Sequence, residues 1–558
     1  MRGAYSAILL VALSAAPSSA RAQSINTPAT DGINVADVVD RMNRAETALF
    51  VRLKSYHPLV EAYIQHLVPD QQFGWVPAKD DYFLGQLDFA DRPRLRPLGQ
   101  ERKQTNRVSR WNPINGGRLL PDGFAAMAAP DWKGLDRSRY QFTFVRREFL
   151  GEARTFVFDV KPLHNGADGF SGRIWIEARD YTLIRFNGIN QGTNQMLSAF
   201  FNDKRLSFHM DGWRVNVMPG VWLPSYVYSE ETDLSDATSP RAKGFRSQVR
   251  IWGYETQAAS SAQQLTSIHI DEAVVDDTDS SGQLSPVMSQ RRWEQEAEAN
   301  VIERLEKIGL LAPAGEVDRV LETVLNNLVV TSKLTLERPL HCRILLTSPL
   351  ESFTIGHTIV LSRGLIDVLP DEASLATMLA HELAHVDLGH PLIDTKFAFA
   401  DRLMVSDADL LQALQFHRTP REETAADERV IELLKTSPYN DKLAGAGLFL
   451  KTIAQSAKQL PNLIQPHIGD HVADGGQIKR FAGLVAEAPA LAPANLEQIS
   501  ALSLGARIVV EPWNDKLVLD KSPAVPLVSV REKMPLAVTP LIPYIRYKDA
   551  VAPQASSR

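Results

Sequence analysis

The stretch LAHELAHVDLGH, residues 379–390, decides how the second half of this chain folds and what it can bind. Two histidines, His381 and His385, stand four residues apart, and Glu382 directly follows the first. On a helix this spacing places both imidazoles on one face, one turn apart, where they can reach a single metal ion. Glu382 then lies beside that face, where its carboxylate can take a proton from a water molecule.

The residues on either side of this motif predict where its helix begins and ends. Asp371 supplies an N-terminal cap with Glu372 in the first turn, and Gly389 followed by Pro391 ends the helix. The alternative interpretation is a solvated pair of histidines on a surface helix. A third ligand would decide between the two, because a catalytic zinc site uses three protein ligands and keeps one position open.

A second helix, predicted for RTPREETAADERVIELL (418–434), supplies that third ligand. Thr419 is a cap, a proline follows it, and Glu422 stands three residues later, which is typical of a helix start. Glu423 and Asp427 then lie one turn apart on one face. We therefore expect Glu423 to be the third metal ligand and Asp427 to accept a hydrogen bond from a ligating imidazole.

Together, SRGLIDVLPDEASLATMLAHELAHVDLGH (362–390) and EETAAD (422–427) resemble the HtpX and CAAX-prenyl-protease family of zinc metallopeptidases, which includes exported BepA-like members. The resemblance covers about residues 315–485. It implies one Zn²⁺ per chain, a general base and a supporting carboxylate. The residues in these roles are His381, His385 and Glu423 as metal ligands, Glu382 as the base and Asp427 as the support, and His390 also matches a histidine that the family often carries.

Two segments depart from the family pattern. Residues 351–358, ESFTIGHT, stand where the family often has Asn-Ala-Phe, at the strand expected to face the substrate. Residues 470–478, DHVADGGQI, carry Gln477 where the family has an arginine, and His471 takes the place of a histidine that can face the metal. We expect His471 either to donate a hydrogen bond to the oxyanion or to block the open site in a resting form.

Composition and the first residues predict an exported protein. The chain has 558 residues, 44% hydrophobic and 23% charged, and its formal net charge of -6 gives no reason to expect nucleic acid as a partner. Residues 1–22 read as a cleaved signal peptide, and no segment is expected to span a membrane, so the protein is predicted to be periplasmic or secreted. The single cysteine, Cys342, excludes an intrachain disulfide and is expected to be buried.

The predicted fold class is α+β. An N-terminal domain (23–275) begins with a helix over 35–53 and contains an antiparallel sheet from about residue 141. A linker (276–289) leads to a mainly helical, zincin-like metallopeptidase domain (290–490) with a small sheet, and a β tail follows (491–558). The alternating aromatic strands are similar in architecture to the open half-barrels of periplasmic lipoprotein-handling proteins, with no shared motif.

These features predict an exported zinc metalloendopeptidase that hydrolyses peptide bonds of protein substrates, with a role in envelope protein quality control. The N-terminal domain is a candidate surface for an envelope protein partner or for recruiting substrates. The alternative is a periplasmic binding or chaperone-like protein in which the zinc site is dormant or structural. Glu382 argues against a structural site, because such a site needs ligands but no adjacent base.

Overall fold

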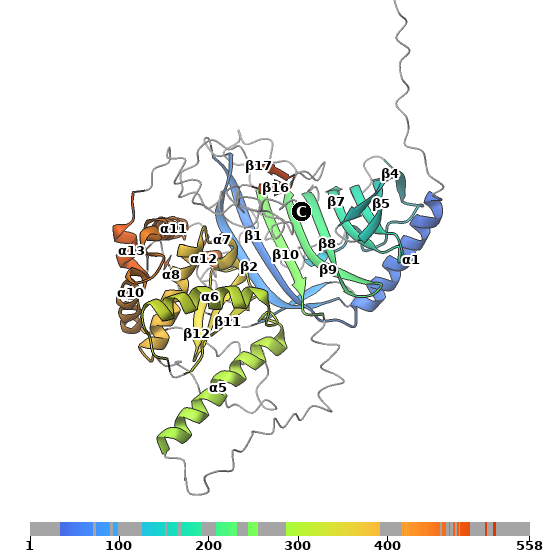
Figure 1. Cartoon of the computed structure of the whole chain (residues 1–558). Coiled ribbons are helices and arrows are strands. Elements are labelled where there is room, and N and C mark those ends of the chain that lie inside the picture. Colours follow the sequence, from blue (N-terminus) through green and yellow to red (C-terminus); the bar gives the residue numbers. More distant parts are fainter. Residues whose placement is uncertain are drawn as a thin grey trace, which may run out of the picture.

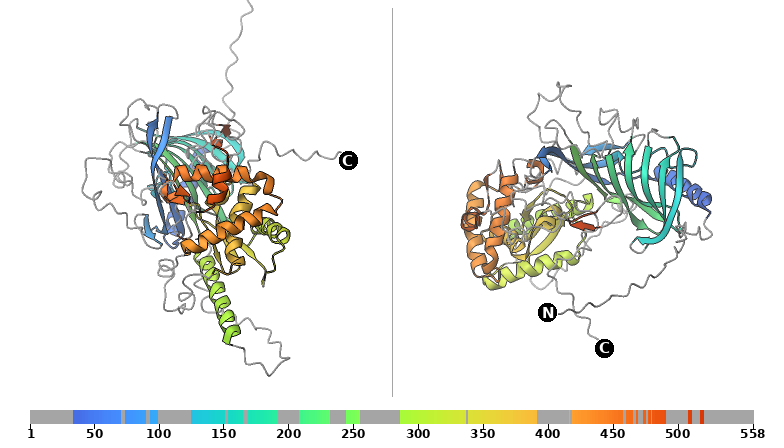
Figure 2. Two further views of the ribbon diagram at one scale, coloured as in Figure 1. Left: turned by 90° about the vertical axis from the view of Figure 1, so that its left-hand side faces the viewer. Right: turned by 90° about the horizontal axis from the view of Figure 1, so that it is seen from above.

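The structure is a computed structural model in which a large sheet and a mainly helical unit lie side by side (Figure 1, Figure 2). The expected signal peptide, most of the expected linker and most of the expected β tail lie outside the described residues. The described residues are 34–70, 74–89, 93–98, 125–150, 153–164, 169–191, 208–231, 244–254, 286–336, 338–390, 416, 418–457, 460–464, 468, 473–474, 477–478, 480–490, 508–510 and 517–519.

Ten antiparallel strands form the large sheet, in the order β3-β2-β1-β10-β9-β8-β7-β6-β5-β4. Neighbouring strands follow one another in the chain from β4 to β10, and the three earliest strands extend the sheet beyond β10. The sequence predicts this sheet from about residue 141, but the first of its strands begins at Leu59. The strands are β1 (Leu59–Asp70), β2 (Gly74–Asp88), β3 (Arg94–Pro97), β4 (Tyr140–Leu150), β5 (Ala153–Pro162), β6 (Gly169–Glu177), β7 (Leu183–Gln191), β8 (Phe208–Met218), β9 (Val221–Glu231) and β10 (Gly244–Trp252).

One face of the large sheet packs against helix α1 (Val35–Leu53), which has the bounds that the sequence predicts. Side chains alternate between the two faces of a strand, so Val60 and Ala62 of β1 enter this apolar core. Glu61 and Tyr63 point to the opposite face, where Tyr63 joins the core of the helical unit. The two units therefore share buried surface along β1.

The second half of the chain combines helices with a three-stranded sheet, which confirms the α+β fold class. In this small sheet β13 is central, with β11 parallel to it on one side and β12 antiparallel to it at the edge. The strands are β11 (His341–Leu345), β12 (Ser352–Ile355) and β13 (Thr358–Ser362). The helices are α5 (Pro286–Ile308), α6 (Glu316–Thr331), α7 (Arg363–Val368), α8 (Glu372–Asp387), α10 (Pro420–Lys435), η3 (Asn440–Lys442), α11 (Leu443–Ser456), α12 (Pro461–Ile464) and α13 (Ala482–Glu487).

Two short antiparallel pairs of strands complete the described chain. They join β14 (Ala473–Asp474) to β15 (Gln477–Ile478) and β16 (Ile508–Val510) to β17 (Leu517–Leu519). Cys342 is 1% exposed in β11, which confirms that the lone cysteine is buried. Among the described residues, every helix is too short or too polar to cross a lipid bilayer.

Glu61 ties the large sheet to the helical unit although it is only 1% exposed. Its carboxylate accepts hydrogen bonds from Ser348 N at 2.6 Å, Ser348 Oγ at 2.7 Å and Tyr82 Oη at 2.8 Å. Arg250 of β10 lies 3.3 Å from the same carboxylate and also donates to Leu346 O at 2.8 Å. A buried charge is tolerated only when it is paired and hydrogen-bonded, so these contacts fix how the sheet meets the loop before β12.

Asp80 of β2 makes the second buried connection between the two units. Its side chain accepts hydrogen bonds from Leu463 N at 2.9 Å, from Asn462 N at 3.1 Å and from Tyr63 Oη at 3.2 Å. Burial outweighs these donors and raises the pKa of Asp80 to about 6. Asp80 therefore changes its charge in mildly acidic solution while it lies inside the interface.

Candidate metal centre

Helix α8 carries the H-E-x-x-H residues and begins at the predicted cap. The Asp371 side chain accepts a hydrogen bond from Ser374 N at 2.8 Å. His381 is 0% exposed, and Glu382 and His385 are each 1% exposed. This burial rules out a solvated pair of histidines on a surface helix, so the polar atoms of all three side chains need partners inside the protein.

Helix α10 brings two carboxylates to the same place. Its start is the predicted capping box, in which Glu422 N donates to Thr419 Oγ1 and Thr419 N donates to the Glu422 carboxylate. Ala426 is 0% exposed in the core that α8 and α10 share, and this small side chain lets the two helices approach closely. Glu423 and Asp427, one turn apart, both face the buried histidines of α8.

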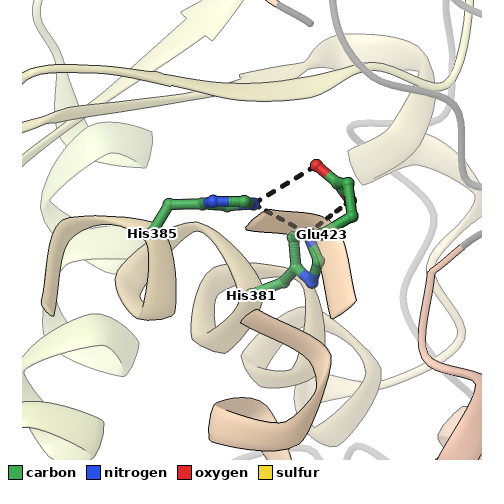
Figure 3. A group of neighbouring side chains, drawn as sticks. All are labelled: His381, His385 and Glu423. Carbon is green, nitrogen blue, oxygen red and sulfur yellow. Dashed lines mark hydrogen bonds and ion pairs between the residues drawn. The ribbon is translucent and has the colours of Figure 1, made fainter. Parts of the chain in front are cut away.

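His381, His385 and Glu423 converge on one point (Figure 3). The two Nε2 atoms are 3.1 Å apart, Glu423 Oε2 lies 3.2 Å from His381 Nε2, and Glu423 Oε1 lies 3.4 Å from His385 Nε2. Atoms that bind a tetrahedral zinc ion at 2.0–2.2 Å are about 3.3–3.6 Å from one another. The spacing of these three groups therefore suits a small cation.

The hydrogen bonds around these side chains are incomplete without such a cation. Glu423 Oε1 is buried and has no hydrogen-bond partner among the described residues. Two facing imidazole nitrogens can share one proton in a hydrogen bond, but that bond provides no donor for Glu423 Oε1. An ion at the point of convergence satisfies the two nitrogens and the carboxylate together, so these residues fit a metal.

Two further side chains lie beside the ring nitrogens of the histidines that face away from the centre. Asp427 Oδ1 lies 3.3 Å from His381 Nδ1, and His390 Nδ1 lies 2.8 Å from His385 Nδ1. Ligating histidines usually hydrogen-bond through the ring nitrogen that does not bind the metal, which fixes the tautomer and the orientation of the ring. His390 makes such a hydrogen bond with His385, whereas Asp427 Oδ1 lies close to His381 Nδ1 without the geometry of a hydrogen bond.

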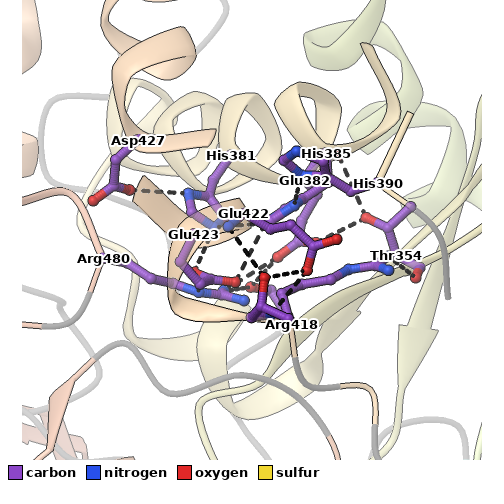
Figure 4. Close-up of polar contacts among 12 residues, drawn as sticks. Thr354, His381, Glu382, His385, His390, Arg418, Glu422, Glu423, Asp427 and Arg480 are labelled. Atoms are coloured by element: carbon purple, nitrogen blue, oxygen red, sulfur yellow. Dashed lines mark hydrogen bonds and ion pairs between the residues drawn. The ribbon is translucent and has the colours of Figure 1, made fainter. Parts of the chain in front are cut away.

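Arg480 enters the site from the segment before α13 and is 1% exposed (Figure 4). Its Nε donates to Glu423 Oε2 at 2.9 Å, and its Nη1 donates to Glu382 Oε1 at 3.2 Å and to Ser352 Oγ at 2.9 Å. The guanidinium thus pairs with both acidic residues of the centre. The sequence prediction missed this residue, which stands three positions after Gln477, where the family's arginine was expected.

The Glu382 carboxylate is held on both oxygens. Ser352 Oγ donates to Oε1 at 2.7 Å, and Thr354 Oγ1 donates to Oε2 at 2.8 Å. Both hydroxyls come from β12, inside the segment where the sequence departs from the family pattern. Each hydroxyl residue is 1–2% exposed, so these bonds are shielded from bulk water.

For both acids, Glu382 and Glu423, burial and nearby charges shift the pKa in opposite directions. Burial disfavours the ionised carboxylates, but Arg480 and the two histidines outweigh it and lower the pKa of both Glu423 and Glu382. Ser352 adds to this effect on Glu382 by donating a hydrogen bond. Both carboxylates are therefore ionised at neutral pH and offer lone pairs, one to a metal and the other to a proton.

The pKa values of the two histidines of α8 shift in opposite directions. Burial and Arg480 act to lower the pKa of His381, but the Asp427 and Glu423 carboxylates raise it above its ordinary value. Burial lowers the pKa of His385, and it also lowers that of the neighbouring His390. A cation at the centre competes with a proton for His381, so metal binding should release protons.

Other residues considered from the sequence lie elsewhere. Asp387 pairs with Arg429 at 2.7 Å on the protein surface, and Glu422 belongs to the capping box. His471 lies outside the described residues, so neither of its two expected roles is tested. Gln477 lies in β15, and its side chain is not described.

Comparison with known proteins identifies the part of the chain that holds the centre. Residues 315–450 match the model of peptidase family M48, and no curated protein matches the chain. A solved LolA superfamily protein from Nitrosomonas europaea is similar at 10% identity and a TM-score of 0.19, over 39% of this chain and 90% of that one. A DUF1329 family protein from Desulfovibrio piger is similar at 10% identity and a TM-score of 0.17, over 38% of this chain and 92% of that one.

The matched segment contains α8 and most of α10, and so it includes both histidines and the glutamate that converge with them. Residues 315–450 of this chain are a metallopeptidase domain of peptidase family M48.

Proposed function

We propose that the protein is an exported zinc metalloendopeptidase that cleaves protein substrates in envelope quality control. The observation that carries this proposal is the convergence of the buried His381 and His385 with the partly buried Glu423, beside the ionised carboxylate of Glu382. Export is supported by the signal-like composition of residues 1–22. Protein substrates are supported by the match to a peptidase family.

In this proposal His381 Nε2, His385 Nε2 and one oxygen of Glu423 hold one Zn²⁺ per chain. Three protein ligands leave a coordination position for water and substrate. A zinc ion bound there lowers the pKa of a water molecule to about 7 and polarises a carbonyl group. Asp427 and His390 keep the two imidazoles turned toward the centre.

Glu382 acts as the general base and then as the general acid. Its ionised carboxylate accepts a proton from the attacking water and returns it to the nitrogen of the leaving amine. Arg480 contacts Glu382 Oε1, so it offsets the negative charge that two acidic groups place in a buried site. Burial excludes bulk water, which strengthens each of these charge interactions.

The substrate lies extended along β12, the edge strand of the small sheet. An edge strand offers unpaired backbone groups to which a peptide can add as a further strand. This strand also contacts Glu382 through its side chains, so a peptide bound there lies beside the proposed base.

The test is to measure metal content and casein cleavage on the signal-free protein and on Glu382→Gln. We expect one zinc per chain in both proteins, cleavage by the wild type only, and loss of cleavage with a chelator. A zinc-free wild type, or a Glu382→Gln variant that still cleaves casein, contradicts the proposal. A zinc-loaded wild type that cleaves nothing supports the alternative, a binding or chaperone-like protein with a dormant site.

A further inference from the structure

Two hydroxyl groups of strand β12 fix the position of the Glu382 carboxylate. Ser352 Oγ and Thr354 Oγ1 each donate to a different carboxylate oxygen, at 2.7 and 2.8 Å. A carboxylate with one contact can rotate about its last bond, but a carboxylate held on both oxygens cannot. The hydroxyl pair therefore sets the plane of Glu382 and the direction of its remaining lone pairs.

The local geometry of β12 aims both hydroxyls at α8. Side chains two residues apart lie on one face of a strand, so Ser352 and Thr354 point the same way. Phe353 between them points to the other face, where its ring stacks on Phe416 with centroids 4.5 Å apart and planes 2° apart. This stacked pair and the burial of all three strand residues keep β12 from turning about its axis.

The backbone of the same two residues faces outward, away from β13. Glu351 O accepts a hydrogen bond from Ser362 N at 2.9 Å, and hydrogen-bonded positions alternate along an antiparallel pair of strands. Ser352 and Thr354 are therefore at the positions whose N–H and C=O groups point to the free edge. In agreement with this, Thr354 O accepts a hydrogen bond from Arg418 at 3.1 Å, from outside the sheet (Figure 4).

We propose that Ser352 and Thr354 are positioning residues that couple the binding of an extended peptide to the placement of the general base. Their backbone groups pair with the substrate strand while their hydroxyls hold Glu382, so one strand aligns both the scissile bond and the proton acceptor. A peptide that pairs with Thr354 takes the place of Arg418 on its carbonyl oxygen. This inference rests on the proposed peptidase activity and assigns roles within that site.

The variants Thr354→Val, Ser352→Ala and the double substitution test this coupling. Valine keeps the shape of threonine but removes the donor, and Thr354→Ser restores a hydroxyl. Thr358→Val is the matched control, because it removes a hydroxyl from neighbouring β13, opposite Ile355. Kinetics on an unstructured peptide give kcat and KM, and zinc content and thermal unfolding are measured on each protein.

We expect Thr354→Val and Ser352→Ala each to lower kcat by about tenfold to a hundredfold, the range for loss of a hydrogen bond to a charged group. KM changes by less than about threefold, because the backbone groups that pair with the peptide remain, and zinc stays at one per chain. Thr354→Ser recovers most of kcat, and Thr358→Val resembles the wild type. A Thr354→Val variant with wild-type or higher kcat overturns the proposal.

A double-mutant cycle separates this inference from the proposed activity. If the hydroxyls act through Glu382, Thr354→Val has little further effect on metal-free unfolding once Glu382 is already alanine, which has no polar side-chain group for a hydroxyl to contact. Equal effects in both backgrounds overturn the inference, even if the wild type cleaves casein. A wild type that cleaves nothing contradicts the proposed function, and the unfolding cycle then decides whether the hydroxyls hold Glu382.

Discussion

Replacing Arg480 by methionine tests the charge balance of the centre most directly. Arg480 is 1% exposed and pairs with Glu423 at 2.9 Å and with Glu382 at 3.2 Å. Methionine has a similar length but no charge, so Arg480→Met leaves two buried carboxylates without their shared cation. Metal-free protein should lose the most stability, because no metal ion then offsets the charge of the two carboxylates.

Removing one partner of a buried ion pair costs about 3–5 kcal/mol of unfolding free energy. For a domain of this size each kcal/mol lowers the melting temperature by about 2–4 °C, so metal-free Arg480→Met should melt about 6–20 °C below the wild type. Added Zn²⁺ supplies positive charge beside Glu423 and recovers part of the loss. The zinc-induced rise in melting temperature is therefore expected to be larger in the variant than in the wild type.

Thermal unfolding with a chelator and with added zinc measures both quantities. Arg429→Met is the matched control, because this arginine also joins α8 and α10 but has a side chain 29% exposed, in a surface pair with Asp387. Its loss should cost less than about 1 kcal/mol. The reasoning is refuted if metal-free Arg480→Met is no less stable than Arg429→Met, or if zinc raises both melting temperatures equally.

Three further predictions address other parts of the structure. Asp427→Asn should weaken zinc binding by about 10–100-fold in a competition titration with a chromogenic chelator, and unchanged affinity would remove its orienting role. Burial raises the pKa of Asp80 from 3.8 to about 6, so the folded state binds this proton more tightly and wild-type stability should rise, relative to Asp80→Asn, as pH falls from 7 to 4.5. Urea titrations of the two proteins at each pH give their unfolding free energies, and the difference between the two should change by at most about 3 kcal/mol over this range. A difference that does not change with pH would contradict the buried charge. His471→Ala should change turnover, and unchanged turnover would remove both roles expected for this histidine.

The sequence predicts the two helices of the centre well because their signals are local. The caps at Asp371 and Thr419 and the spacing of the acidic and histidine side chains are enough to place α8 and α10. The pairing of Glu423 with a histidine 42 residues earlier was inferred from the need for a third ligand on a nearby helix, and the resemblance to a family implied the same residue. Local patterns carry no information about which helices touch.

Local sequence patterns did not predict the role of Arg480 or the strands β1 and β2. Arginine is almost never fully buried unless it is paired, and its two acidic partners lie 57 and 98 residues away. In β1 and β2 the buried residues Glu61 and Asp80 interrupt the apolar alternation that predicts a strand. Both acids are explained by partners on the helical unit, which sequence periodicity cannot reveal.

The contacts of Asp80 also bear on the order in which the molecule assembles during synthesis. Asp80 meets Asn462 across 382 positions of the chain, and Glu61 meets Ser348 across 287. A nascent chain has made its first strands long before these partners leave the ribosome, so closure between the halves comes late and is intrinsically slow. Arg480 emerges later still. The growing polypeptide therefore cannot complete the buried contacts of Glu382 and Glu423 until translation is nearly over.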